Sequence, residues 1–235
     1  MFYTVGGRGC ISCANTKLGC TKITDVHPSI AFLVKLKYLN LRNCKRLESL
    51  PTKIEMKFLE TMILSGCTYL QRFPEIDGNM KCLQKLYLDG TGIEELPSSV
   101  GHLGSLEVLN LSDCSKLENL STSLIRRKYR MGRGVLSSSL NLMLFKQSLN
   151  PMALTLPRLS GLSSLTELNI SGRNLLQGPL PSDICCLPSL ETLILSDNNF
   201  VSLPANLCQL TKIHRLELRF ARSLKHCLSF SAGLR

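Results

Sequence analysis

The chain has 235 residues, of which 44% are hydrophobic and 19% charged, which excludes global disorder and leaves enough apolar material for a core. Tryptophan is absent and aromatic residues are only 6%, so the apolar content is mainly aliphatic. The net charge of +11 favours acidic partners, but the basic residues are spread along the chain without an aromatic stacking platform, which disfavours nucleic acid.

The beginning of the chain lacks a signal-peptide core, and no apolar run is long enough to span a membrane. We therefore expect a cytoplasmic protein that does not contact the membrane. Its 11 cysteines are then expected to be reduced thiols, and their odd number argues against a closed disulfide framework.

A motif of the form L-x-x-L-x-L recurs along the chain at steps of 23, 24, 23, 59, 25 and 23 residues. Most of these steps fall within the 20–29 residues of leucine-rich repeats. Gly, Ser, Asn and Pro interrupt every unit, which excludes a continuous amphipathic helix. The predicted fold class is α/β, a leucine-rich-repeat solenoid (horseshoe) with short parallel strands on the concave face and irregular or 3-10 segments on the convex face. The motifs begin at Leu36, Leu59, Leu83, Leu106, Leu165, Leu190 and Ile213.

Two further features keep the register of the motif. An apolar residue followed by proline recurs, as in Leu50-Pro51 and Leu96-Pro97, and proline suits the convex arc rather than a central strand. Three residues beyond the third apolar position, a small polar side chain is expected to bond the backbone of the turn. These positions hold Cys44, Cys67, Thr91, Cys114, Arg173, Asn198 and Ala221.

The period divides the chain into five parts. The repeats are interrupted by a segment with five basic residues at 126–133, interpreted as a solvated loop or as a nuclear-import or acidic-partner tract, which makes the nucleus an alternative location. Within it, 140–144 is a candidate degenerate strand. The predicted parts are a non-repeat segment 1–17, repeats 18–120, an irregular basic insertion or degenerate repeat 121–160, repeats 161–226 and a tail 227–235.

Chemical motifs are weak throughout the chain. Four residues could serve as zinc ligands, but a single C-x-x-C motif is a poor signal. One of them, Cys20, also fits the turn position of the repeat. The histidines lie in no recognisable nucleophile or metal motif, and the glycine-rich segment 6–9 lacks the lysine and Ser/Thr of a phosphate loop. We therefore expect no enzyme activity, no cofactor and no metal. The four zinc candidates are Cys10, Cys13, Cys20 and His27.

The positions between the leucines point outward from the predicted strands and form the expected binding surface. Tyr and Arg are the residue types that most often anchor protein interfaces, and a plain hydrophilic surface is the alternative. The candidate partner-binding residues are Tyr38, Arg42, Tyr87, Asp89, His214, Arg215, Glu217 and Arg219.

The segments LKYLNLRNCKRLESLP, FLETMILSGCTYLQRFPE, LYLDGTGIEELPSSV and LEVLNLSDCSKLENL resemble the leucine-rich region of plant Toll/interleukin-receptor-type, nucleotide-binding disease resistance proteins. The Cys-x-x-Leu-x-x-Leu-Pro cadence is fairly specific to that class, and the resemblance covers roughly 18–120 and 147–225. It implies a protein-binding module of an intracellular immune receptor that contributes to pathogen recognition, autoinhibition and defence. The implied partners are a pathogen effector, a guarded host protein or the receptor's own nucleotide-binding domain.

The chain departs from that family, because it contains neither a Toll-like domain nor a phosphate loop, and the family's NAD-cleaving and nucleotide-binding activities are not carried over. One alternative is an extracellular receptor-like repeat protein, which the segment from Asn174 to Pro181 resembles. The absence of a signal-peptide core and of paired capping cysteines counts against it. The other alternative is a receptor fragment without a function of its own.

Overall fold

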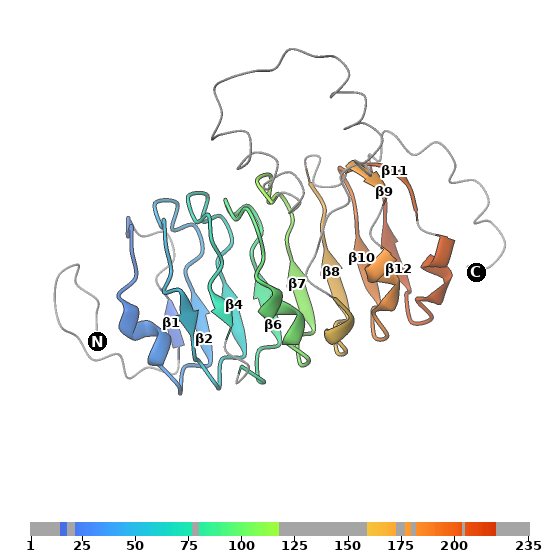
Figure 1. Cartoon of the computed structure of the whole chain (residues 1–235). Helices are drawn as coiled ribbons and strands as arrows, with labels where there is room; N and C mark the ends of the chain where they lie inside the picture. Colours follow the sequence, from blue (N-terminus) through green and yellow to red (C-terminus); the bar gives the residue numbers. More distant parts are fainter. Residues whose placement is uncertain are drawn as a thin grey trace, which may run out of the picture.

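The computed structural model describes residues 15–17, 22–76, 80–117, 159–172, 177–179, 182–203 and 205–219. In this part of the chain, one parallel sheet of eight short strands runs the length of the molecule, and each strand lies beside the strands that precede and follow it in the sequence (Figure 1). The strands are β1 (Asn15–Lys17), β2 (Tyr38–Asn40), β4 (Thr61–Ile63), β6 (Lys85–Tyr87), β7 (Val108–Asn110), β8 (Glu167–Asn169), β10 (Thr192–Ile194) and β12 (Arg215–Glu217).

The leucine motif folds this way because its apolar positions alternate with polar ones in an extended segment, which places the apolar side chains on one side. The central residue of each strand from β2 to β10 is at most 1% exposed, as at Leu39 and Leu109. The pairing sets these residues side by side, for example Leu39 against Met62 and Leu86 against Leu109. Buried residues from Ile30 to Leu210 form one continuous core. The predicted leucine-rich-repeat solenoid is therefore confirmed.

The opposite side of the solenoid carries 3-10 turns, as predicted for the convex face, and also two short ladders that were not predicted. The 3-10 helices are η1 (Pro28–Phe32), η2 (Ser98–His102), η3 (Leu159–Gly161), η4 (Ser182–Cys186) and η5 (Ala205–Gln209). The ladders pair β3 (Lys53–Ile54) with β5 (Glu75–Ile76), and β9 (Gln177–Pro179) with β11 (Asn199–Ser202). Turns on adjacent units approach closely at Gly161, where a Cβ atom would lie 2.0 Å from the carbonyl oxygen of Gly101.

The third residue after each strand has a positive φ in every described turn from β2 to β10. Residues other than Gly, Asn and Asp adopt this backbone conformation only with strain, which explains the narrow choice of residue types. These residues are Asn43, Gly66, Gly90, Asp113, Gly172 and Asp197, with φ of 58°, 73°, 64°, 56°, 116° and 59°. The turn therefore imposes its own sequence requirement, independent of the leucines.

In three of the described turns, the side chain of the fourth residue after the strand bonds the backbone of the preceding turn. The thiols of Cys67 and Cys114 donate to the carbonyl oxygens of Leu41 and Leu88, each over 3.1 Å, and Asn198 makes the corresponding bond in its turn. Burial raises the pKa of the Cys67 thiol to about 12, so this group remains a protonated donor at neutral pH. The predicted role of this position, to bond the turn backbone, is confirmed at these residues.

Two strand pairings bear on the expected division of the chain. Residues 1–17 were predicted to lie outside the repeat, but Asn15–Lys17 forms β1 and pairs with β2 in the register of the other strands. This strand was missed because Thr16 stands at the level of Leu39, where the motif calls for leucine. At the interruption, β7 pairs directly with β8, Leu109 lying against Leu168. The candidate strand at 140–144 and the basic tract at 126–133 lie outside the described residues.

Candidate binding surface

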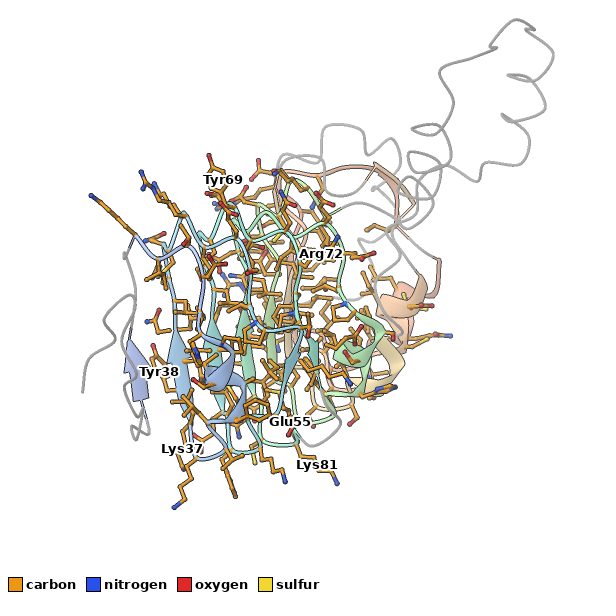
Figure 2. All side chains as sticks on the ribbon, turned by 60° about the vertical axis from the view of Figure 1, so that its left-hand side comes forward. Lys37, Tyr38, Glu55, Tyr69, Arg72 and Lys81 are labelled. Atoms are coloured by element: carbon orange, nitrogen blue, oxygen red, sulfur yellow. The ribbon has the colours of Figure 1, made fainter. Side chains whose placement is uncertain are left out.

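The outward side of the eight-stranded sheet, called here the strand face, consists of the side chains between the buried leucines and of the second residue after each strand, as at Arg42 and Asp89. Most of these side chains are partly buried by their neighbours on adjacent strands, whereas Arg42 and Lys85 are exposed. Figure 2 shows Lys37 and Tyr38 near β2 at one end of this surface, with Tyr69 and Arg72 toward the upper side of the solenoid in that view. The strand face is thus a row of closely spaced, laterally supported polar side chains.

Asparagines hold the turns that follow three of the strands. The side-chain oxygens of Asn40, Asn110 and Asn169 accept hydrogen bonds from the backbone N–H two residues later, over 2.9 to 3.0 Å. At Asn40 the amide also donates to the Tyr38 hydroxyl over 3.2 Å, which orients that ring on the strand face. The backbone N–H bonded to Asn40 belongs to Arg42, whose exposed side chain points away from the core.

Tyr87 and Asp89 lie in the middle of the sheet, where polar groups of three strands meet. The Asp89 carboxylate accepts from the Ser65 hydroxyl over 2.7 Å and from the Asn110 amide over 3.3 Å. Burial, together with the charges of Glu167 and Asp89, raises the pKa of the Tyr87 hydroxyl above its ordinary value. Tyr87 therefore presents a neutral, partly buried aromatic ring within a region of negative potential.

The remaining candidates belong to the last described strand. Arg215 donates from Nε and Nη2 to the Glu217 carboxylate over 2.8 and 2.5 Å. His214 and Arg219, on either side, are exposed. A further exposed ion pair joins Lys37 to Glu60 at the other end of the sheet, over 2.8 Å. Exposed pairs of this kind contribute little to stability, so these side chains remain available for other contacts.

The structure does not bring the predicted residues together in a single cluster. Tyr38, Arg42, Tyr87 and Asp89 occupy β2 to β6 and the turns after them, whereas the other four belong to β12 and its flanks. The strands β7, β8 and β10 lie between the two groups, and none of their outward residues is among the predicted partner-binding residues. They include Glu107, Glu167 and Glu191, which are not among the candidates because the choice was guided mainly by the Tyr and Arg residues of the outward positions.

Of the four zinc candidates, the structure describes only His27, which caps a 3-10 helix. The ring Nδ1 of His27 accepts from the backbone N–H of Ser29 over 3.2 Å and so caps η1, while Cys10, Cys13 and Cys20 lie outside the described residues. No group of three or more metal-ligating side chains occurs among the residues that the structure describes. Within the same residues, no helix has the length and apolarity needed to cross a bilayer.

The repeated turn, the thiol and amide bonds between turns and the single parallel sheet together define a leucine-rich-repeat solenoid with a polar strand face. Two solved structures share this fold over 87% of the chain. The plant peptide hormone receptor RGFR1 matches with a TM-score of 0.54 and 19% identity over 28% of its chain. The ectodomain of the Arabidopsis thaliana receptor kinase GASSHO1/SCHENGEN3 matches with 0.51 and 23% over 24% of its chain.

The family model described as "Disease resistance protein RPS4B-like, leucine-rich repeats" matches residues 55–230, and the chain belongs to this family. It is 31% identical to the TMV resistance protein N of Nicotiana glutinosa over 87% of the chain and 21% of that protein. It is 35% identical to the disease resistance protein RPS4B of Arabidopsis thaliana over 81% of the chain and 14% of that protein. The chain is thus a leucine-rich-repeat module homologous to plant disease resistance proteins, and it spans about a fifth or less of the length of these relatives.

Proposed function

We propose that the chain is the protein-binding module of a plant intracellular immune receptor, that its strand face is the binding surface, and that it acts in pathogen recognition and autoinhibition. The observation that carries this proposal is the position of Tyr38 and Tyr87, two partly buried aromatic residues on the strand face of a continuous hydrogen-bonded sheet. Aromatic side chains that are already fixed in place lose little entropy on binding, and they dominate the energy of many interfaces.

The partner is a protein: a pathogen effector, a guarded host protein or the nucleotide-binding domain of the receptor itself. Support for a protein partner comes from the fold, because the receptor RGFR1 was solved in complex with RGF2 and the GASSHO1/SCHENGEN3 ectodomain in complex with CASPARIAN STRIP INTEGRITY FACTOR 2. The polar, hydrogen-bonded strand face also suits a binding surface rather than a catalytic centre. On this proposal, the module binds its partner and catalyses no reaction.

The cytoplasm is the proposed location, with the nucleus as the alternative. The thiols of Cys67 and Cys114 support this assignment, because each donates a hydrogen bond between turns that a disulfide would abolish. A reducing compartment keeps such thiols intact.

The proposal is tested by affinity capture from plant extract, with wild-type chain and two variants as bait. The Tyr38→Ala/Tyr87→Ala double variant removes the aromatic residues of the strand face, and Tyr69→Ala is the control because Tyr69 is 61% exposed away from that face. We expect quantitative mass spectrometry to show partners that are retained by wild type and by Tyr69→Ala but lost from the double variant. Partners retained equally by all three baits would contradict a role for the strand face.

The alternative of a fragment without function is addressed by hydrogen exchange on the same purified chain. Protection throughout β2–β7 and β8–β12 is the expected result, because these strands form one hydrogen-bonded sheet. Rapid exchange throughout would favour the alternative, since a chain that does not fold cannot present a strand face.

A further inference from the structure

The middle of the strand face has a charge opposite to that of the whole protein. Four carboxylates lie on successive units there, while the chain as a whole carries a net charge of +11. Lys85, on β6, is the one cationic residue among the outward positions of β6, β7, β8 and β10 that the structure describes. We call these carboxylates the acidic patch; they are Asp89, Glu107, Glu167 and Glu191.

Among the residues that the structure describes, three members of the acidic patch have no side-chain hydrogen-bond or ion-pair partner. Glu107, Glu167 and Glu191 are partly buried, and none of them makes a side-chain hydrogen bond or ion pair with any residue that the structure describes. This contrasts with Glu60 and Glu217, which are paired with Lys37 and Arg215 on the same face. A carboxylate that has lost part of its hydration without gaining a counter-charge is favourably placed to accept one from outside.

Apolar side chains accompany the acidic patch. Val108 lies on β7 beside the backbone of Lys85 and Glu167, and the Tyr87 ring is one strand away. Burial, and after it the charges of Glu167 and Asp89, raise the pKa of the Tyr87 hydroxyl, so these two carboxylates lie close enough to Tyr87 to act on its hydroxyl. The surface therefore offers a short apolar contact bordered by negative charge, with paired or basic residues at both ends of the sheet.

We propose, building on the proposed function, that the acidic patch binds a lysine- or arginine-bearing protein segment, whose aliphatic stems cover Val108 and Tyr87 while its cationic ends meet Glu107, Glu167 and Glu191. Long basic side chains can make both contacts at once, because their stems are apolar and their ends charged. The same charge distribution disfavours nucleic acid on this face, since phosphates would meet unpaired carboxylates.

The test uses the full chain and three short acetylated, amidated peptides in which serine alternates with arginine, with neutral citrulline or with glutamate. Binding is measured by isothermal titration calorimetry. The chain is strongly cationic, so general electrostatic attraction would favour the glutamate peptide, whereas the acidic patch favours the arginine peptide. We expect the arginine peptide to bind more tightly than the citrulline peptide, and its affinity to fall as salt is added.

Two triple variants locate the binding. Glu107→Gln/Glu167→Gln/Glu191→Gln should weaken binding of the arginine peptide about tenfold, because three modest ion pairs are lost. The control removes the same charge from exposed carboxylates outside the strand face, and it should leave the affinity within about twofold of wild type. The control residues are Glu48, Glu94 and Glu95, each changed to glutamine. Equal weakening by both triple variants, or equal binding of arginine and citrulline peptides, would overturn the proposal.

Other occupants give distinct results. A dimer detected by light scattering and abolished by the Glu107/Glu167/Glu191 variant would assign the acidic patch to a second copy of the chain and overturn the proposal. Loss of captured partners from Tyr38→Ala/Tyr87→Ala, without any preference for the arginine peptide, would leave the strand face as a binding surface while refuting its cationic ligand. The two proposals therefore fail in distinguishable ways.

Discussion

Asn198 gives the sharpest test of how adjacent turns are held together. Its side chain is fully buried, and its amide donates to the carbonyl oxygens of Ile170 in the preceding turn and Leu195 in its own, over 2.7 and 2.9 Å. Asn198→Ala removes both hydrogen bonds, so that two buried carbonyl groups each lose a donor, at a cost of about 1–3 kcal/mol each. Allowing for relaxation and water entry, we expect the free energy of unfolding to fall by about 3 kcal/mol.

The matched variant is Asn198→Cys, because cysteine occupies the same position in other turns. There the thiols of Cys67 and Cys114 each donate one bond to the preceding turn. A thiol is a weaker donor than an amide and makes one of the two bonds, so the cysteine variant should lose about half as much stability. Urea unfolding measures both losses, and hydrogen exchange should locate them in β8–β12. Equal destabilisation by alanine and cysteine would refute the idea that the position requires a donor to the preceding turn.

Three further predictions follow from packing and titration. Gly161→Ala should destabilise by about 2 kcal/mol or more because its Cβ meets a backbone oxygen, whereas Gly104→Ala, with no atom closer than 3.8 Å, should be close to neutral in thermal unfolding. Leu111→Asp should unfold neighbouring turns by burying an unpaired charge, while Tyr87→Ala should leave the circular dichroism melt nearly unchanged; equal losses would contradict the assignment of inside and outside. The pKa of the Cys67 thiol rises from 9.0 to about 12 on folding, so its contribution to stability is constant below pH 9 and decreases from pH 9 towards 12. The free energy of unfolding, measured with urea at pH 8 and at pH 10.5, should therefore decrease less for Cys67→Ala than for wild type.

The candidate surface was only partly predictable from the sequence. The outward positions of the strands followed from the period, so the placement of Tyr38 and Tyr87 on the strand face agrees with the sequence pattern. The distance of Tyr38 and Tyr87 from Arg215 and Glu217 could not be predicted from the period. It depends on the number of strands that lie between them, and the interruption of the period made that number uncertain. The pairing of β7 with β8 resolves it.

The sequence by itself determined the repeat, the buried leucines and the residues that bond the turns, because each depends on spacing within a single unit. The turn residues with positive φ were equally available in the sequence, as the recurring Gly, Asn and Asp at one position of the motif. Only the tertiary structure revealed β1, where Thr16 replaces leucine and pairing with β2 supplies the evidence that composition lacks. The acidic patch was likewise revealed only by the tertiary structure. Glu107 and Glu167 are 60 positions apart in the chain, and they become neighbours only because strands pair across the interruption.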